Sequence, residues 1–155
     1  KAFYATKDDV VAEKMAIMLA KAKYQMHTRV SVEACELVKI ALNSMLAVKV
    51  AFANVLYDVA RANKANYDEL VSMMLADGWL SRFGLQVPGR HGRGYSGTCL
   101  PKDLGWLIRT VAVLGDGKVI ASEEAQGWLQ ALQDYNVDLL TLGTEDPHEV
   151  RKEGV

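Results

Sequence analysis

Apolar residues recur at helical spacing over most of this 155-residue chain. In residues 8–25 they stand three or four positions apart, while charged side chains occupy the other directions. Asp8 or Asp9 suits the N-cap, because a short carboxylate accepts hydrogen bonds from the first unpaired backbone N–H groups. The segment is therefore predicted to be an amphipathic helix whose apolar side carries Val11, Met15, Met18 and Ala22.

Residues 31–63 predict one long helix, which no glycine or proline interrupts and for which Ser31 suits the N-cap. At about 1.5 Å per residue it would be roughly 50 Å long, longer than a domain of this size is wide. It is apolar on more than one face, so we expect its own domain or a partner chain to cover it on several sides. Its repeating apolar positions are Leu37, Ala41, Met45, Val48, Phe52, Val55 and Val59.

The second half of the chain predicts shorter elements around a loop. Gly78 suits the residue that ends a helix, and Pro101 suits a first helical turn. Segment 84–97 is rich in glycine and reads as a loop. Helices are expected at 67–76, 101–114 and 122–140, with a single helical turn at 79–83.

The first residues predict a strand rather than a helix. Residues 2–6 have β-type composition and residues 26–29 read as a connector. A lone strand has no sheet of its own to join, which leads us to expect further residues upstream. The predicted fold class is mainly α: a helical bundle around one long central helix, with one stray N-terminal strand.

Composition narrows the function classes. The formal net charge is −1, so there is no basic excess to neutralise nucleic-acid phosphates. Two cysteines are too few for a disulfide framework, which favours a reducing, cytoplasmic compartment. The most apolar stretch, 37–59, carries two lysines, two asparagines and an aspartate, so it is a poor candidate for a membrane span.

Two constellations carry candidate chemistry. Lys39 and Asn43 are four residues apart and share a helix face. Lys39 either pairs with Glu36 or extends to solvent, or it joins Asn43 in holding an oxygen atom of a substrate. The second constellation is the glycine-rich loop that ends in Cys99, directly before Pro101. A helix N-terminus and a nearby lysine, Lys102, would both favour a thiolate there.

The other candidates are weaker. Cys35 lies within the long helix, where packing is the default role of a cysteine. His27 and His91 have no metal-ligand partners at useful spacing, so no zinc site is predicted. Arg82, between an aromatic residue and a glycine, suits either an anion site or a solvated chain segment.

Together these motifs resemble the central helical domain of the UDP-glucose/GDP-mannose dehydrogenase family. The resemblance spans roughly residues 2–115. It rests on two separated motifs in the family's order and on a short Arg-x-Gly element at Arg82. The first motif is Glu36-x-x-Lys39-x-x-x-Asn43, followed by Leu46-Ala47-x-Lys49; the second is Gly94-Tyr-Ser-Gly-Thr-Cys99-Leu-Pro-Lys102-Asp103.

The resemblance implies oxidation of the C6 alcohol of a UDP- or GDP-sugar to a carboxylate, with two NAD molecules used in turn. Cys99 matches the nucleophile that forms a thiohemiacetal and then a thioester. Lys39 matches the lysine that stabilises the oxyanion, Asn43 the amide that orients it, and Asp103 the carboxylate that assists proton transfer. Residues matched to substrate binding are Arg82, Gly94, Tyr95, Gly97 and Lys102, with Arg82 reaching the site of the other subunit.

The resemblance also implies a domain organisation. Residues 1–30 correspond to the end of a Rossmann-type NAD-binding domain, 31–141 to a central helical domain, and 142–155 to a linker toward a C-terminal domain. The fold is expected to be like the C-terminal domain of 6-phosphogluconate dehydrogenase, with a homodimer formed through the long helix. NAD would be bound mainly by a domain absent from this chain, no metal is implied, and the pathway would be nucleotide-sugar metabolism and polysaccharide biosynthesis.

This chain departs from the family pattern at several places. Ser96 stands where the family has a second glycine, and the loop before Gly94 holds two or three extra residues. Two alternatives stay open. One is the helical domain of a 6-phosphogluconate or β-hydroxyacid dehydrogenase, families that share Lys-x-x-x-Asn but lack the Cys99 loop. The other is a non-catalytic helical dimerisation module.

Overall fold

The computed structural model describes residues 2–24, 27–89, 92–112 and 123–142. The chain forms two compact units, residues 1–42 and 43–155. His91, His148 and the expected linker beyond Leu142 lie outside the described residues.

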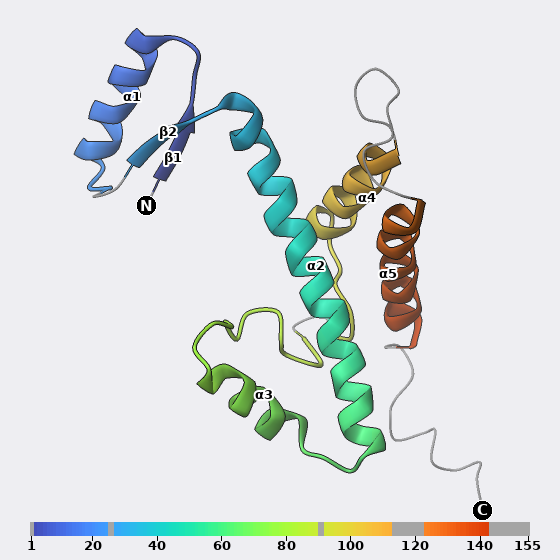
Figure 1. Cartoon of the computed structure of the whole chain (residues 1–155). Coiled ribbons are helices and arrows are strands. Elements are labelled where there is room, and N and C mark those ends of the chain that lie inside the picture. Colours follow the sequence, from blue (N-terminus) through green and yellow to red (C-terminus); the bar gives the residue numbers. More distant parts are fainter. Residues whose placement is uncertain (1, 25–26, 90–91, 113–122, 143–155) are drawn as a thin grey trace, which may run out of the picture. The chain divides into compact units, whose positions relative to one another are not determined.

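The N-terminal unit begins with a β-α-β arrangement (Figure 1). Strand β1 (Ala2–Ala5) and strand β2 (His27–Val30) pair in parallel, and helix α1 (Asp9–Lys21) connects them. Asp8 is the N-cap of α1, and its Oδ1 accepts the backbone N–H of Val11 at 3.0 Å, as the sequence predicts. The stray strand therefore has a partner, and the expectation of a connector at 26–29 is wrong at residues 27–29.

An arginine ties the second strand to the turn after the first. The Arg29 guanidinium donates to the carbonyl oxygen of Thr6 from Nε at 3.1 Å and from Nη2 at 2.7 Å. Its Nη1 forms an ion pair with Asp9 in the first turn of α1. The apolar side predicted for α1 is not covered by these strands, since Val11 is 42% and Met18 59% exposed.

Helix α2 (Val32–Ala62) is one uninterrupted helix of 31 residues, about 46 Å long at 1.5 Å per residue. Ser31 caps it, with Oγ accepting the N–H of Ala34 at 3.1 Å. Small and polar side chains form its buried face: Ser44, Ala47, Ala51, Ala53, Asn54 and Ala60. The larger apolar residues predicted as its stripe lie outside, with Met45 66%, Phe52 55% and Val59 52% exposed.

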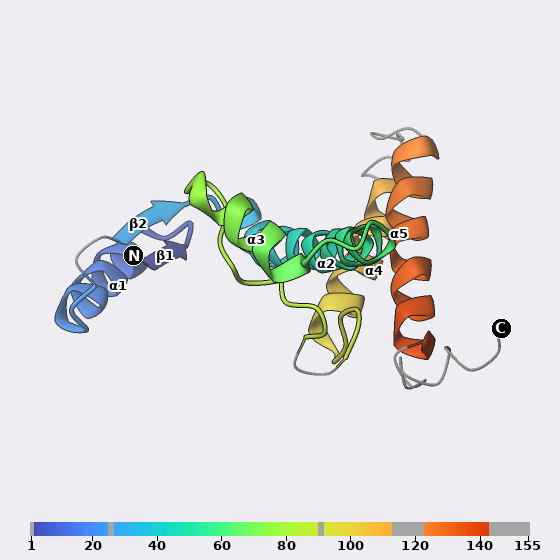
Figure 2. The same cartoon turned by 90° about the horizontal axis from the view of Figure 1, so that it is seen from below.

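Helices α3 (Tyr67–Ala76), α4 (Cys99–Ala112) and α5 (Glu123–Leu142) belong to the second unit. Helices α4 and α5 lie side by side (Figures 1 and 2), and one core cluster joins them to α2. A second cluster joins α3, Leu85 and the last turns of α2. The buried members of the two clusters are Ala47, Tyr95, Leu104, Ile108 and Leu129, and Ala53, Ala60, Tyr67, Val71 and Leu85.

These helices confirm the mainly α class and the predicted segment 67–76. Gly78 follows the C-cap with a φ of +78°, a conformation that glycine adopts without strain. The expected helical turn at 79–83 is wrong, because these residues form bends and a turn. By length and composition alone α2 could cross a membrane, a criterion that core helices of globular proteins also meet.

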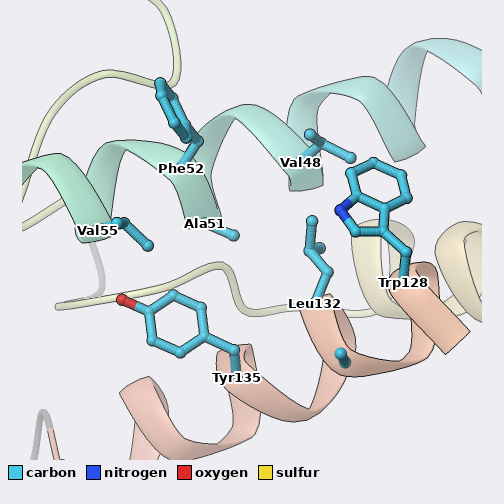
Figure 3. A pocket seen from close by; sticks show the side chains of 8 residues that line it. Val48, Ala51, Phe52, Val55, Trp128, Leu132 and Tyr135 are labelled. Atoms are coloured by element: carbon cyan, nitrogen blue, oxygen red, sulfur yellow. The ribbon is translucent and has the colours of Figure 1, made fainter.

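A hollow of about 310 Å³ lies between α2 and α5 (Figure 3). Its lining is almost wholly apolar, and the Tyr135 hydroxyl stands at one end. Its lining includes two exposed aromatic residues, Phe52 of α2 and Trp128 of α5. The lining residues are Val48, Ala51, Phe52, Val55, Trp128, Ala131, Leu132 and Tyr135.

Candidate functional site

Cys99 is the first residue of α4, and it is exposed. The carbonyl oxygen of Thr98 accepts the N–H of Lys102 at 3.3 Å, which closes the first turn around Pro101. The Thr98 hydroxyl lies 4.0 Å from Cys99 Sγ. The free N–H groups of a helix N-terminus favour negative charge, so this is a suitable place for a reactive thiol.

Asp103 lies one helical turn after Cys99 on the same face of α4. It is 3% exposed, and Asn43 of α2 donates to its Oδ2 from Nδ2 at 2.6 Å. Lys102 Nζ stands 3.6 Å from Oδ1, on a largely exposed side chain. The fold thus brings Asn43 and Asp103 into contact across sixty residues of sequence and places both beside the turn that carries Cys99.

Lys39 precedes Asn43 by one turn of α2 and belongs to the N-terminal unit. It is exposed, which is compatible both with a side chain that extends to solvent and with one that binds a substrate oxygen. Within the second unit, the candidate site therefore consists of Asn43, Cys99 and Asp103.

The glycine-rich loop is fixed by a buried amide. Asn136 of α5 accepts the N–H of Tyr95 at 2.7 Å and donates to the carbonyl oxygen of Tyr95 at 2.9 Å. Gly94 has a φ of +74°, and a Cβ there would lie 2.7 Å from Asn136 Oδ1. Only glycine fits this place, which explains one glycine of the motif by geometry. Gly97 also has a positive φ but stands in open space.

The Tyr95 ring is buried in the core between α2, α4 and α5, at 3% exposure. Its hydroxyl has no hydrogen-bond partner among the described residues, and burial raises the pKa of Tyr95 to about 12. Tyr95 is therefore held inside the protein twice, by its ring in the core and by its N–H and carbonyl on Asn136.

Arg82 is exposed in a turn that α2 holds in place. Lys49 Nζ donates to the carbonyl oxygen of Ser81 at 2.6 Å, and the N–H of Leu85 donates to the carbonyl oxygen of Arg82 at 3.1 Å. Lys49, noted in the sequence only as part of a motif, thus positions the Arg82 turn.

Arg93 was not a candidate from the sequence, yet it joins the loop to α2. Its Nε donates to Asn54 Oδ1 at 3.1 Å, and its Nη2 lies 2.6 Å from Asp58 Oδ2. Its guanidinium stands over the Tyr57 ring, 5.5 Å from the ring centroid. The residues of α2 that face it, Asn54 and Asp58, are one turn apart, a spacing that gives a signal only once the loop is known to fold back on α2.

Residues 92–97 are Gly-Arg-Gly-Tyr-Ser-Gly, which matches the Gly-x-Gly-x-x-Gly pattern of dinucleotide-binding loops and precedes helix α4. Such a loop binds a dinucleotide only where a strand precedes it, and here bends and an isolated Gly89–Gly92 bridge do. The described residues therefore do not give this fingerprint the context of an NAD site. They also contain no group of three His, Cys, Asp or Glu side chains that could hold a metal ion.

Comparison with known proteins decides the family. Residues 33–122 match the family model for the central domain of UDP-glucose/GDP-mannose dehydrogenases. The chain belongs to this family. It is 35% identical over 75 residues to the UDP-glucose 6-dehydrogenase of Rhizobium meliloti (strain 1021), an alignment that covers 48% of this chain and 16% of that protein. The matched domain holds both motifs that carried the resemblance. The matched part of the chain spans about a sixth of the length of this relative.

Proposed function

We propose that this central domain supplies the covalent nucleophile of a nucleotide-sugar 6-dehydrogenase that acts on a UDP- or GDP-sugar. The observation that carries the proposal is the Asn43–Asp103 hydrogen bond at 2.6 Å, one turn from Cys99 on α4. It places an amide and a buried carboxylate beside an exposed thiol at a helix N-terminus, a set that suits capture of an aldehyde.

In the proposed chemistry, Cys99 Sγ attacks the C6 aldehyde of the sugar. The S–C bond forms, the carbonyl π bond breaks, and the carbonyl oxygen takes a proton to complete the thiohemiacetal. Asn43 donates toward the developing oxyanion, and Lys39 adds positive charge in the assembled enzyme. Asp103 accepts or returns the proton, since it is the carboxylate on the same face of the helix.

The loop takes part through its backbone. Gly94 and Gly97, both at positive φ, can present backbone groups to a sugar nucleotide, whereas the N–H and carbonyl of Tyr95 are bonded to Asn136, so Tyr95 fixes the loop. Lys102 is exposed next to Asp103 and can approach the phosphate or sugar oxygens. The family is NAD-dependent in general, and we propose that the dinucleotide is bound by residues outside this chain, because the described residues before the fingerprint at 92–97 do not form the strand that such a site requires.

Dimerisation through α2 is part of the proposal. Met45, Phe52 and Val59 are more than half exposed on a helix whose other face packs within the second unit. A partner copy on this face would bring its Arg82 toward the Cys99 loop, as the family resemblance implies. A cytoplasmic location stays a prediction.

The test uses the complete gene product that contains residues 1–155, supplied with UDP-glucose and NAD. Cys99→Ser should abolish NADH formation while leaving binding of UDP-glucose within a few-fold, since an alcohol stays protonated near neutral pH. The matched control is Cys35→Ser, a partly buried cysteine of α2, which should stay within a few-fold of the unmodified rate. Near-normal turnover of Cys99→Ser would overturn the proposal.

An isotope experiment tests the covalent step without turnover. The C6 aldehyde of the sugar nucleotide, labelled with ¹³C at C6, should give a carbon resonance of a thiohemiacetal with the unmodified protein. Cys99→Ser should show only the free aldehyde and its hydrate. The labelled adduct on Cys35 instead would mean that the wrong cysteine has been assigned.

A further inference from the structure

In the described part of the loop before Cys99, the charged side chain of Arg93 attaches the backbone to α2. Asn54 is 1% exposed, and its Nδ2 donates to the carbonyl oxygen of Val50 at 2.9 Å. This bond orients the amide so that Oδ1 accepts from Arg93 Nε at 3.1 Å. Asp58 adds an ion pair at 2.6 Å, and the Arg93 side chain is only 21% exposed.

The contacts that attach the loop to α2 differ from the contacts that hold helix α4, which carries Cys99. Arg93 directly precedes Gly94, whose neighbour Tyr95 is held by Asn136. Helix α4, which carries Cys99, is seated by other contacts: Leu104 is fully buried and Asp103 is bonded to Asn43. A change at Arg93 therefore acts first on residues 92–98 and not on the helix of the thiol.

We propose that Arg93 is a positioning residue: by binding Asn54 and Asp58 it holds the backbone of Gly94–Thr98 in the conformation that receives the sugar nucleotide. This inference rests on the proposed function for its substrate and on the geometry alone for the attachment. Because the thiol and Asp103 sit on α4, the loss of Arg93 weakens substrate binding and spares the chemical step.

The strength of the attachment follows from burial. An exposed ion pair contributes little to stability, and Asp58 is nearly half exposed. Asn54 Oδ1 is different, because removal of Arg93 leaves a buried oxygen without this donor. The Asn54 contact thus dominates, and the Asp58 contact adds to it.

The first experiment measures hydrogen exchange of the 155-residue chain. In Arg93→Met the backbone amides of residues 94–98, including the Tyr95 N–H, should exchange roughly tenfold faster, because the loop opens more often. Asp58→Asn should give a smaller increase, and amides of α4 should be unchanged. Arg61→Met is the matched control, since Arg61 stands over the same Tyr57 ring at 5.7 Å but lies on α2 itself.

The second experiment measures steady-state kinetics of the complete gene product with UDP-glucose and NAD. Arg93→Met should raise KM for UDP-glucose roughly tenfold with kcat within threefold, and Arg93→Lys should recover part of the loss, because one donor and the charge remain. A purely structural role would lower the amount of folded protein and leave KM unchanged.

The outcomes separate the two proposals. Unchanged exchange at residues 94–98 in Arg93→Met overturns the attachment. Faster exchange with unchanged KM overturns the substrate-positioning role, and an equal fall in kcat overturns the separation of loop and nucleophile. An unmodified enzyme that binds and oxidises no nucleotide sugar refutes the proposed function and the substrate role with it, while the exchange result still decides whether Arg93 holds the loop.

Discussion

Replacement of Gly94 by alanine tests the geometry of the loop most directly. Gly94 has a φ of +74°, and an alanine in a left-handed conformation costs about 1–2 kcal/mol. The added Cβ would also lie 2.7 Å from Asn136 Oδ1 and 3.3 Å from Leu139 Cβ. Asn136 would have to move and weaken its two hydrogen bonds to Tyr95, at about 0.5–1.5 kcal/mol each. The expected loss in the free energy of unfolding is therefore about 2–5 kcal/mol.

Gly97→Ala is the matched control for this substitution. Gly97 has a φ of +83°, and a Cβ there would meet nothing within 4 Å. Its loss should be the backbone strain alone, about 1–2 kcal/mol. Urea denaturation followed by tryptophan fluorescence measures both variants. All three tryptophans, Trp79, Trp106 and Trp128, lie in the 43–155 unit, so the signal reports the unit that contains the loop.

A double-mutant cycle completes this test. If the clash with Asn136 carries the excess loss, Gly94→Ala should cost clearly less in an Asn136→Ala background than in the unmodified chain. Equal losses for Gly94→Ala and Gly97→Ala, or strictly additive effects of Gly94→Ala and Asn136→Ala, would refute the account of why glycine is required at residue 94.

Three further predictions concern other parts of the molecule. Burial raises the pKa of Tyr95 from 10.0 to about 12, so the neutral side chain stabilises the fold fully below pH 10. The free energy of unfolding should then fall by about 2–3 kcal/mol between pH 10 and 12. Urea denaturation across that range should show Tyr95→Phe to lack this part of the loss. Asn43→Ala removes a donor from the buried carboxylate of Asp103 and should lower the free energy of unfolding by about 1.5–3 kcal/mol in the same assay, and an unchanged value would contradict the bond. Light scattering after size exclusion should show a dimer that Phe52→Glu dissociates and that Met73→Glu, 70% exposed on α3, leaves intact; a monomeric unmodified chain would contradict the dimer.

Local signals in the sequence were sufficient for most helices. The N-cap residues Asp8 and Ser31 and the residue that ends α3, Gly78, act within one turn of their own helix, so each can be recognised without the fold. Strand β2 could not be recognised this way. Its four residues include the polar His27 and Arg29, and their extended conformation depends on pairing with β1, some twenty-five residues earlier in the chain.

Periodicity found the faces of α2 but could not say which one the chain covers. The face that packs within the second unit is made of small residues such as Ala47 and Ala51, because small side chains let neighbouring helices approach closely. The bulkier residues, Met45 and Phe52 among them, are exposed. A hydrophobicity scale ranks the face with bulky side chains as the core, whereas the face that is buried by close packing has small side chains.

The candidate site shows the same limit. The motifs predict Asn43 and Asp103 as site residues, and the fold brings these two side chains into hydrogen-bond contact. Arg93 had no such signal, because its partners lie 39 and 35 residues earlier and form a surface only after the loop folds back on α2. Interactions between distant segments are the part of this site that a single sequence does not predict.

The backbone conformation of the loop shows whether Ser96, which stands where the family has a glycine, disturbs it. A glycine is required in this loop only where φ is positive, and the two such positions after Arg93 are Gly94 and Gly97. The non-glycine residues with positive φ in the described part of the chain are Lys23 and Lys64, so Ser96 adopts an ordinary conformation. Serine there costs no strain, and it reduces the freedom of the unfolded loop relative to glycine. The positions that need glycine, Gly94 and Gly97, have kept it, and Arg93 and Asn136 hold the backbone on either side of Gly94. Serine at residue 96 is therefore compatible with a loop that binds a ligand.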